Sequence, residues 1–539
     1  MKSLGEKKLR KMHEAMSDIR DEILDYSRKY KVYVLICFLL GVIMYFPIIT
    51  QPLTNADGIT ISLTHKSSHE WENSLGRFGL QYVDRMRGNY IFPELTTFFC
   101  LFLLACIAVL IIEIFQISSK AARAAVGVIL ILSPSVANTL TYYYCSDSYM
   151  LAYLLAVLSA FFLLNKTRPA SWALAIISIA TSLTLYQAYI GVTITICLFW
   201  TIQHCLDIFE EKKKLYRTIG RALSAGLLGV ILYLGLFKLN QLITGVAAAD
   251  NRGFNEMGHL SLKELPVLIK RACIVALQYF FSDDLINNSW MHRKWLNVLI
   301  VGVTGAVIIY LFFNKKRVKD KGRILMAIVG ILCIPVSLGC MVILAPEVDI
   351  YGATSLLMLP QMSIAYIFAI SMYKYLAANR IWFKAPLIAG ALGVLFLLGT
   401  SAVYTSAFQT RLKENLNKTY HVASEIVHQM CSMDNYDASR KVMIGGKMES
   451  GNYPDLDNQL AWAMEGTVAN YGLIWPSPSA SQGCWHGVFN QFLGVNYTMC
   501  SVEEYNRISQ MDEYKEMGNF PEEDSIKVIE GITVVKLSD

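Results

Sequence analysis

Apolar runs long enough to cross a membrane recur along most of this chain. A helix needs about 20 mainly apolar residues to cross a hydrocarbon core of roughly 30 Å. A soluble protein would alternate apolar and polar faces instead. We therefore predict a polytopic α-helical membrane protein with about eleven transmembrane helices. The predicted spans are 32–50, 95–116, 122–141, 149–165, 170–187, 189–205, 221–241, 295–313, 324–344, 352–373 and 384–406.

The composition supports this class. Hydrophobic residues make up 54% of the 539 residues and charged residues 17%, whereas soluble domains carry about 25% charged residues. The net charge of +6 does not indicate nucleic-acid binding, because the basic residues form short clusters between the apolar runs. We interpret these clusters as topology signals.

The distribution of Lys and Arg predicts the orientation. Cytoplasmic loops are enriched in these residues, and every second polar segment of this chain is basic. The short loops 142–148, 186–189 and 345–352 contain neither Lys nor Arg. We therefore predict a cytoplasmic N-terminus and an extracytoplasmic C-terminus. The predicted parts are an amphipathic helix on the inner leaflet over 1–31, a transmembrane domain over 32–406, outer loops over 51–94 and 242–294, and an extracytoplasmic domain over 407–539.

The C-terminal domain is predicted to be a small α/β unit. A helical pattern begins near Leu412, a strand covers 441–446, and a hairpin with a Glu-Gly turn covers 526–535. Outside the cell a disulfide persists, so Cys484 and Cys500 are candidates for one. In that case Cys431 stays free, although other pairings among the three cysteines remain open.

Asp57 is the first candidate for chemistry. It follows the first span by about seven residues and precedes Gly58, which permits a tight turn. A carboxylate close to the membrane surface can act as a general base on a hydroxyl. The simpler alternative is that Asp57 only forms the turn, which is the usual role of Asp-Gly.

The segment 69–83 has the pattern of a helix lying on the membrane surface, with Trp71, Leu75, Phe78 and Tyr82 on one face. It carries two further candidates, Glu72 and Arg77. An arginine can bind a lipid phosphate through its planar fork of donors. A plain contact with lipid headgroups explains Arg77 equally well.

Further candidates lie in the outer loops. The loop from Tyr142 to Tyr149 contains three consecutive tyrosines, including Tyr144, and one acid, Asp147. The aromatic residues form either an interfacial belt or a platform for a sugar ring, and Asp147 is either a site residue or a helix N-cap. Arg293 and Lys294 in the second long loop are candidate cations, or ordinary loop charges.

Several motifs are absent from the sequence. There is no phosphate-binding P-loop, no GxGxxG and no HExxH. We therefore expect neither ATP-driven work nor metalloprotease chemistry, and we predict no cofactor and no metal.

Four short motifs together resemble a known family. They are Asn-Ala-Asp-Gly at 55–58, Trp-Glu with Gly-Arg at 71–77, Ser-Asp-Ser-Tyr at 146–149, and Tyr186-Gln187 at the end of the fifth span. Their order and the many spans are similar to the bacterial type-II O-antigen glucosyltransferases, serotype-converting enzymes of the GT-C superfamily. The resemblance covers about residues 30–410. Family members often have paired acids after the first span, whereas Asp57 has no adjacent acid, so the second acid is left open.

The resemblance implies a polyprenyl-phosphate-sugar donor, typically undecaprenyl-phosphate-glucose, and transfer to a cell-surface glycan. The reaction would take place on the outer side of the bacterial plasma membrane. On this reading, Asp57 deprotonates the acceptor, and Arg77, helped by Arg293 or Lys294, stabilises the leaving phosphate. The substrate-binding candidates are Glu72, Arg77, Tyr144, Asp147, Tyr186, Gln187 and Arg293.

Two other classes remain open. A lipid-linked sugar transporter or flippase would place polar residues near the membrane midplane, often on broken helices, and the region around Tyr186 is the one feature that favours it. A non-catalytic scaffold or receptor would use the C-terminal domain as a sensor. The sugar, the acceptor and the linkage do not follow from the sequence.

Overall fold

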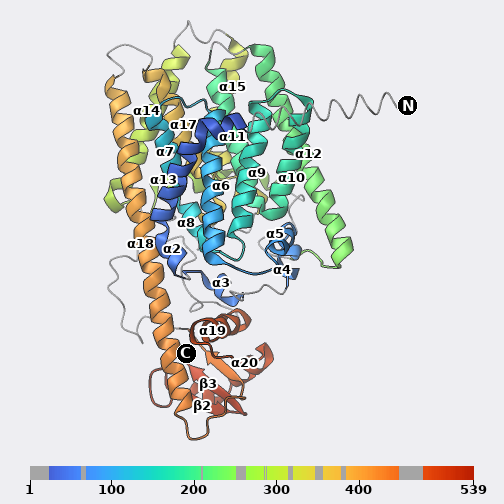
Figure 1. Ribbon diagram of the computed structural model, residues 1–539, viewed down its shortest axis with the longest axis vertical. Coiled ribbons are helices and arrows are strands. Elements are labelled where there is room, and N and C mark those ends of the chain that lie inside the picture. The colour runs from blue at the N-terminus through green and yellow to red at the C-terminus, as the bar shows by residue number, and fades with distance from the viewer. Residues whose placement is uncertain are drawn as a thin grey trace, which may run out of the picture.

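The computed structural model is a bundle of helices with a small α/β domain beyond one end (Figure 1). The structure describes residues 24–51, 53–61, 68–207, 211–249, 263–283, 286, 288–313, 320–345, 356–377, 384–447 and 478–539. Most of the predicted N-terminal amphipathic helix over 1–31 lies outside the described residues.

Within the described ranges, seven helices are long and apolar enough to cross a membrane, or eight if the bent pair α7–α8 forms one span. The pair bends by 46° where Pro134 begins α8, because proline interrupts the helical hydrogen bonds. The bundle consists of the helix over 24–44, α2 (Phe46–Thr50), α6 (Pro93–Ile114), α7 (Lys120–Ile131), α8 (Pro134–Leu140), α9 (Ser146–Leu164), α10 (Pro169–Leu185), η1 (Gln187–Tyr189), α11 (Ile190–Cys205), α12 (Lys212–Thr244), α13 (Leu265–Phe281), η3 (Trp290–His292), α14 (Arg293–Phe313), α15 (Lys321–Leu338), α16 (Met341–Leu344), η4 (Leu356–Met358), α17 (Met362–Ala377) and α18 (Lys384–Cys431).

The membrane class is confirmed, and the described part of every predicted span is largely helical. Three predicted spans are not among these eight: the first, which corresponds to the helix over 24–44 with α2, and the fifth and tenth, which correspond to the shorter apolar helices α10 and α17. The total of eleven transmembrane helices therefore stays a prediction, and so does the orientation of the chain.

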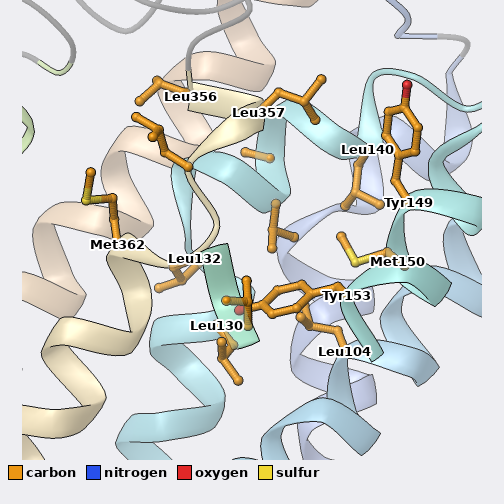
Figure 2. Packing of buried hydrophobic residues seen from close by; sticks show 14 of the residues in the cluster. Leu104, Leu130, Leu132, Leu140, Tyr149, Met150, Tyr153, Leu356, Leu357 and Met362 are labelled. Carbon is orange, nitrogen blue, oxygen red and sulfur yellow. The ribbon is translucent and has the colours of Figure 1, made fainter. Parts of the chain in front are cut away.

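The centre of the bundle is built on α9, which packs against α6 and α10. α6 is apolar all round, as expected for a helix enclosed by lipid and other helices. Figure 2 shows Met150 and Tyr153 of α9 beside Leu104 of α6 and Leu130 of α7. This packing fixes the start of α9, which carries Asp147 of the candidate site.

The first predicted outer loop contains three short helices, α3 (Ala56–Thr60), α4 (Glu70–Ser74) and α5 (Leu80–Met86). The prediction of one surface helix over 69–83 is wrong, because Gly76 adopts a positive φ of 71° and breaks it. As a result Phe78 is buried, while Trp71 and Tyr82 are exposed.

The second predicted outer loop, 242–294, also contains a helix. α13 packs against α14, α15 and α16 and buries Leu268, Val275 and Tyr279. The sequence places two basic residues, Lys270 and Arg271, in the middle of this helix. This helix was not predicted from the sequence.

The C-terminal domain is attached through α18, which runs without a break from the bundle into the domain (Figure 1). The predicted strand and hairpin are confirmed: β1 (Val442–Gly445) pairs in parallel with β3 (Ile532–Lys536), and β2 (Ile526–Ile529) pairs antiparallel with β3. Glu530 and Gly531 form the turn with positive φ values of 47° and 76°. The remaining elements are α19 (Pro478–Leu493), α20 (Val502–Ile508) and α21 (Asp512–Lys515).

The predicted disulfide between Cys484 and Cys500 is not formed, and both side chains are buried thiols. The Cys484 thiol bonds to Thr60 of α3, whereas the Cys500 thiol donates to Gln482 Oε1 at 3.8 Å. The two thiols therefore have different partners, one on the transmembrane domain and one within the C-terminal domain. Cys431 is free and exposed.

Candidate active site

Asp57 lies in the first turn of α3, and its backbone is held by the residues before it. Asn55 is the N-cap of this helix and accepts a hydrogen bond from the Gly58 N–H at 2.9 Å. Thr54 and Asn55 both donate to Thr141. Thr141 precedes the turn of Tyr142, Tyr143, Tyr144 and Cys145 before α9, here called the tyrosine turn. Gly58 is required here, since a Cβ would lie 1.9 Å from Thr54 Oγ1. The capping role therefore belongs to Asn55 and not to Asp57.

α19 of the C-terminal domain packs directly on α3 (Figure 1). Gly487 makes the closest approach, because a Cβ there would lie 2.0 Å from the Ile59 carbonyl oxygen. Gln491 donates to the carbonyls of Ile59 and Ile61 at 3.0 and 3.2 Å. The C-terminal domain therefore covers one face of the helix that carries Asp57.

Asp57 is half-buried and lies close enough to two neighbours to affect their ionisation. Burial raises the pKa of the Tyr144 hydroxyl well above its usual value, and Cys145 and the Asp57 carboxylate add to this rise. Burial also raises the pKa of the Cys484 thiol to about 12, with a further contribution from Asp57. Asp57 therefore lies between the tyrosine turn and α19.

The second group of charges is centred on Arg87, at the end of α5. Its guanidinium forms ion pairs with the buried carboxylates of Asp84 and Asp147, the latter at 3.3 Å between Nε and Oδ2. It also donates to the Tyr144 carbonyl at 3.1 Å. His69 Nδ1 lies 3.7 Å from Asp84. Two acids and one arginine thus meet beside the tyrosine turn, where α5 contacts the start of α9.

Asp147 pairs with Arg87 and does not cap α9. It lies in the first turn of α9, and its Oδ1 accepts from the Ser148 N–H at 2.8 Å, while its other oxygen faces Arg87. The N-cap residue of α9 is Cys145. The N-cap alternative for Asp147 is wrong.

Arg77 lies over an aromatic platform. Its guanidinium carbon is 4.6 Å from the ring centroid of Tyr186, and Nη1 donates to the Tyr149 hydroxyl at 3.2 Å. The rings of Tyr149 and Tyr186 stack with centroids 4.3 Å apart. Within the part of the chain that the structure describes, Arg77 Nε is buried without a hydrogen-bond partner. The guanidinium is thus held in place with a donor still available.

The position of Arg77 is set by the preceding turn. Gln187 donates to the Leu75 carbonyl at 2.8 Å and to the Tyr233 hydroxyl at 2.9 Å, and Tyr233 donates to the Gly76 carbonyl at 3.2 Å. Gln187 therefore holds the turn that precedes Arg77. Glu72 contributes through its backbone, since its carbonyl accepts from the Arg77 N–H at 2.8 Å, and its side chain is buried.

Arg293 belongs to a different region. It is buried at the start of α14, and Nη1 donates to Ser401 of α18 at 3.4 Å. Together with Tyr279 and Tyr366 it lines a cavity of about 10 Å³, which holds at most one water molecule. The structure thus groups Asp57, Arg77, Tyr144, Asp147, Tyr186 and Gln187 around the tyrosine turn, and places Arg293 among α13, α14, α17 and α18.

The sequence analysis missed Asp84 and Arg87. The two residues are three positions apart at the end of a helical segment, a spacing at which opposite charges commonly form an ion pair. Their link to Asp147 crosses 60 positions and has no local signal. Within the described ranges, no group of three His, Cys, Asp or Glu side chains is arranged to hold a metal ion.

The family model described as glucosyl transferase GtrII matches residues 46–372. The chain belongs to this family. The matched range includes Asp57, Arg77, Arg87 and Asp147, and it ends before α18 and the C-terminal domain. No curated protein and no solved structure matches the chain.

Membership of the GtrII family makes the protein a glycosyltransferase and agrees with the resemblance inferred from the four motifs. The family also indicates which chemical groups the site needs. A glycosyl transfer needs a base for the acceptor hydroxyl and positive charge near the leaving group. Asp57, Arg77 and Arg87 supply these kinds of groups within one region of the molecule.

Proposed function

We propose that the protein transfers a sugar, most simply glucose, from a polyprenyl-phosphate donor to a cell-surface glycan on the outer side of the plasma membrane. The observation that supports this most directly is the convergence of Asp57, Arg77 and Arg87 on the tyrosine turn at one end of an apolar bundle. A polyprenyl donor keeps its chain in lipid and its phosphate at the interface. Such a donor matches cations placed at the ends of transmembrane helices.

The proposed reaction is a single displacement with inversion at the anomeric carbon. Asp57 takes the proton of the acceptor hydroxyl while the hydroxyl oxygen forms a bond to the anomeric carbon. The bond from that carbon to the phosphate oxygen breaks, and its electron pair leaves with the polyprenyl phosphate. Arg77 then stabilises the charge that develops on the phosphate, because a preorganised cation in a water-poor site needs little rearrangement.

Arg87 takes the role of second cation that the sequence analysis assigned to Arg293 or Lys294. Asp84 and Asp147 hold its guanidinium beside the Tyr144 carbonyl. We assign Asp147 to positioning Arg87 in addition to the binding of sugar hydroxyls. The buried rings of Tyr144 and Tyr186 border the same space and are proposed to contact a sugar face.

The decisive experiment is the Asp57→Asn variant in proteoliposomes. The substitution keeps the size of the side chain, and Asn55 still caps α3, so folding should be unaffected. We expect sugar transfer to fall by about 10²–10⁴-fold, the usual contribution of a general base. Asp437→Asn is the matched control, since Asp437 is an exposed acid that bonds to Ser439 in the C-terminal domain. A folded Asp57→Asn protein with wild-type transfer would falsify the assignment of the base.

An assay in the same vesicles distinguishes a glycosyltransferase from a flippase. An enzyme consumes the polyprenyl-phosphate-sugar and releases the lipid phosphate, whereas a flippase moves the intact donor between leaflets. Donor labelled in the sugar and recovered unchanged on the other side, with no labelled glycan, would favour the flippase.

A further inference from the structure

A large apolar groove lies at the end of the bundle opposite the site. It is formed by the helix over 24–44, α6, α9 and α10, and its volume is about 790 Å³. α6 connects the two regions, because Pro93 follows the α5 segment that carries Arg87, while Glu113 lies at the groove. The groove is lined almost entirely by apolar side chains, among them Phe38, Phe102, Cys106, Leu110, Leu158 and Phe162.

The walls of the groove are fixed by contacts at both of its ends. Toward the site, the helix over 24–44 touches α6 closely, since a Cβ on Gly41 would lie 2.9 Å from Leu101 Cδ2. At the other end the Tyr30 hydroxyl bonds to Glu113, and the ring of Tyr26 meets that of Phe161 of α9 at 6.1 Å. The recess between these contacts is therefore part of the packed bundle.

Positive charge is concentrated at the Glu113 end of the groove. Lys31 is exposed on the first helix, and Lys166 follows α9 on the opposite wall. Lys166 Nζ lies 5.9 Å from the ring centroid of Tyr26 and 5.3 Å from that of Phe161. Partial burial, together with Arg168, lowers the pKa of Lys166. A bound anion would offset this cost.

The length of the groove matches one leaflet of a bilayer. The lining residues of α6 extend from Phe102 to Glu113, which is about 16 Å at 1.5 Å per residue. This is close to half of a hydrocarbon core of roughly 30 Å. An acyl chain lying along α6 from the Glu113 end would fill the groove and stop near the contact between Gly41 and Leu101.

We propose that the groove binds one anionic glycerophospholipid from the leaflet at the Glu113 end, with its phosphate between Lys31 and Lys166 and one acyl chain along α6. The sequence predicts this leaflet to be the cytoplasmic one. The occupant differs from the proposed donor, whose phosphate belongs beside Arg77 at the other end of α6. The proposal therefore does not depend on the proposed reaction.

The test uses the full-length protein purified in detergent and stripped of lipid. Phosphatidylglycerol is added back, and bound lipid is counted by native mass spectrometry. We expect one tightly bound molecule on the wild-type protein. The double variant Lys31→Gln/Lys166→Gln should bind roughly thirty-fold more weakly, since each lysine near an anionic surface adds about fivefold. Lys120→Gln/Lys384→Gln removes two exposed lysines at the starts of α7 and α18 and should bind normally.

Two further arms test the occupant. Phosphatidylcholine, which has no net charge, should bind roughly as weakly as phosphatidylglycerol binds to the double variant. Cys106→Trp should fill the groove and abolish tight binding while both lysines remain. Equal binding of the two phospholipids, or unchanged binding to the double variant, would overturn the charge argument. Polyprenyl phosphate that displaces phosphatidylglycerol one for one would show that the groove holds the donor chain instead. Because the readout is binding, failure of this proposal is distinguishable from failure of the proposed reaction.

Discussion

The two ends of α6 carry charges in opposite settings. At the Pro93 end, Arg87 pairs with Asp84 and Asp147, whose side chains are 1% and 5% exposed. At the Glu113 end, Glu113 pairs with Lys29, whose side chain is 52% exposed. Lys29 is thus half-exposed to solvent, whereas both acids of the Arg87 cluster are almost completely buried.

The difference indicates where function is located. Burial of an ion pair costs several kcal/mol per charge in lost hydration, and a well-packed apolar group would often serve stability better. Ionisable residues at membrane depth are accordingly rare and mostly functional. The exposed pair at the other end needs no such explanation, because it costs little to form. Four substitutions follow, from the largest expected effect to the smallest, and the first and the last test this contrast directly.

Arg87→Met should destabilise the protein most. It leaves the carboxylates of Asp84 and Asp147 buried without their cation, and breaking a buried pair in this way costs about 3–5 kcal/mol. Thermal and denaturant unfolding in detergent measure the loss. Arg85→Met, on the exposed face of the same helix, is the matched control and should change stability little. Equal losses in the two variants would mean that the buried cluster has no special energetic role.

Gly487→Val should separate α19 from α3. The added side chain meets the Ile59 carbonyl oxygen, and forced overpacking of this kind costs about 1–3 kcal/mol. We expect sugar transfer to decrease because α3 carries Asp57, while the sheet of the C-terminal domain stays folded. Limited proteolysis and a transfer assay test both points. Gly483→Ala is the milder control, because its Cβ would lie 3.2 Å from Thr60 Cγ2.

Gln187→Leu should have a smaller effect on stability and a more specific one on the donor. It removes the hydrogen bonds to the Leu75 carbonyl and to the Tyr233 hydroxyl, and each such loss costs about 1 kcal/mol. Because the turn before Arg77 loosens, the apparent KM for the donor should rise. Gln203→Leu removes another buried glutamine, which bonds to Ser371. It should lower stability to a similar extent with no change in KM, and a matching rise in KM would remove the positioning role of Gln187.

Lys29→Met should change stability least. An exposed ion pair contributes about 0–1 kcal/mol, and salt screens it within roughly 10 Å at 0.1 M ionic strength. The difference from wild type in unfolding should disappear at about 1 M salt, where the screening length is only about 3 Å. A loss as large as that of Arg87→Met would remove the contrast between the two ends of α6.

The sequence predicts the transmembrane domain well where the signal is local. Apolar runs mark the helices, and the Glu-Gly turn marks the hairpin, because both depend on neighbouring residues. The break at Gly76 was missed because the residues on either side continue a helical pattern. The convergence of Asp57, Arg77, Asp147 and Tyr186 could be expected only from the order of the motifs. The pairing of Arg87 with Asp147 depends on how α5 meets α9, which no short pattern encodes.

The domain boundary shows a different limit. A change in composition near residue 407 suggested the end of a membrane helix and the start of a separate domain. The structure has one helix, α18, across that point. The change from apolar to polar residues marks where the helix leaves the bundle, not where the helix ends. The part of α18 beyond the bundle still has a buried face that includes Leu412, Val422 and Ile426.

The continuity of α18 links the height of the C-terminal domain to its rotation. A helix of 48 residues is about 72 Å long, and each residue added within it lifts the C-terminal domain by about 1.5 Å and turns it by about 100°. One alanine inserted after Gln409 would therefore direct α19 away from α3. Seven would restore the angle to within roughly 20° but leave the domain about 10 Å too high. A flexible linker would absorb either change. In a continuous helix, however, α19 meets α3 only if the number of residues between the bundle and the C-terminal domain is unchanged.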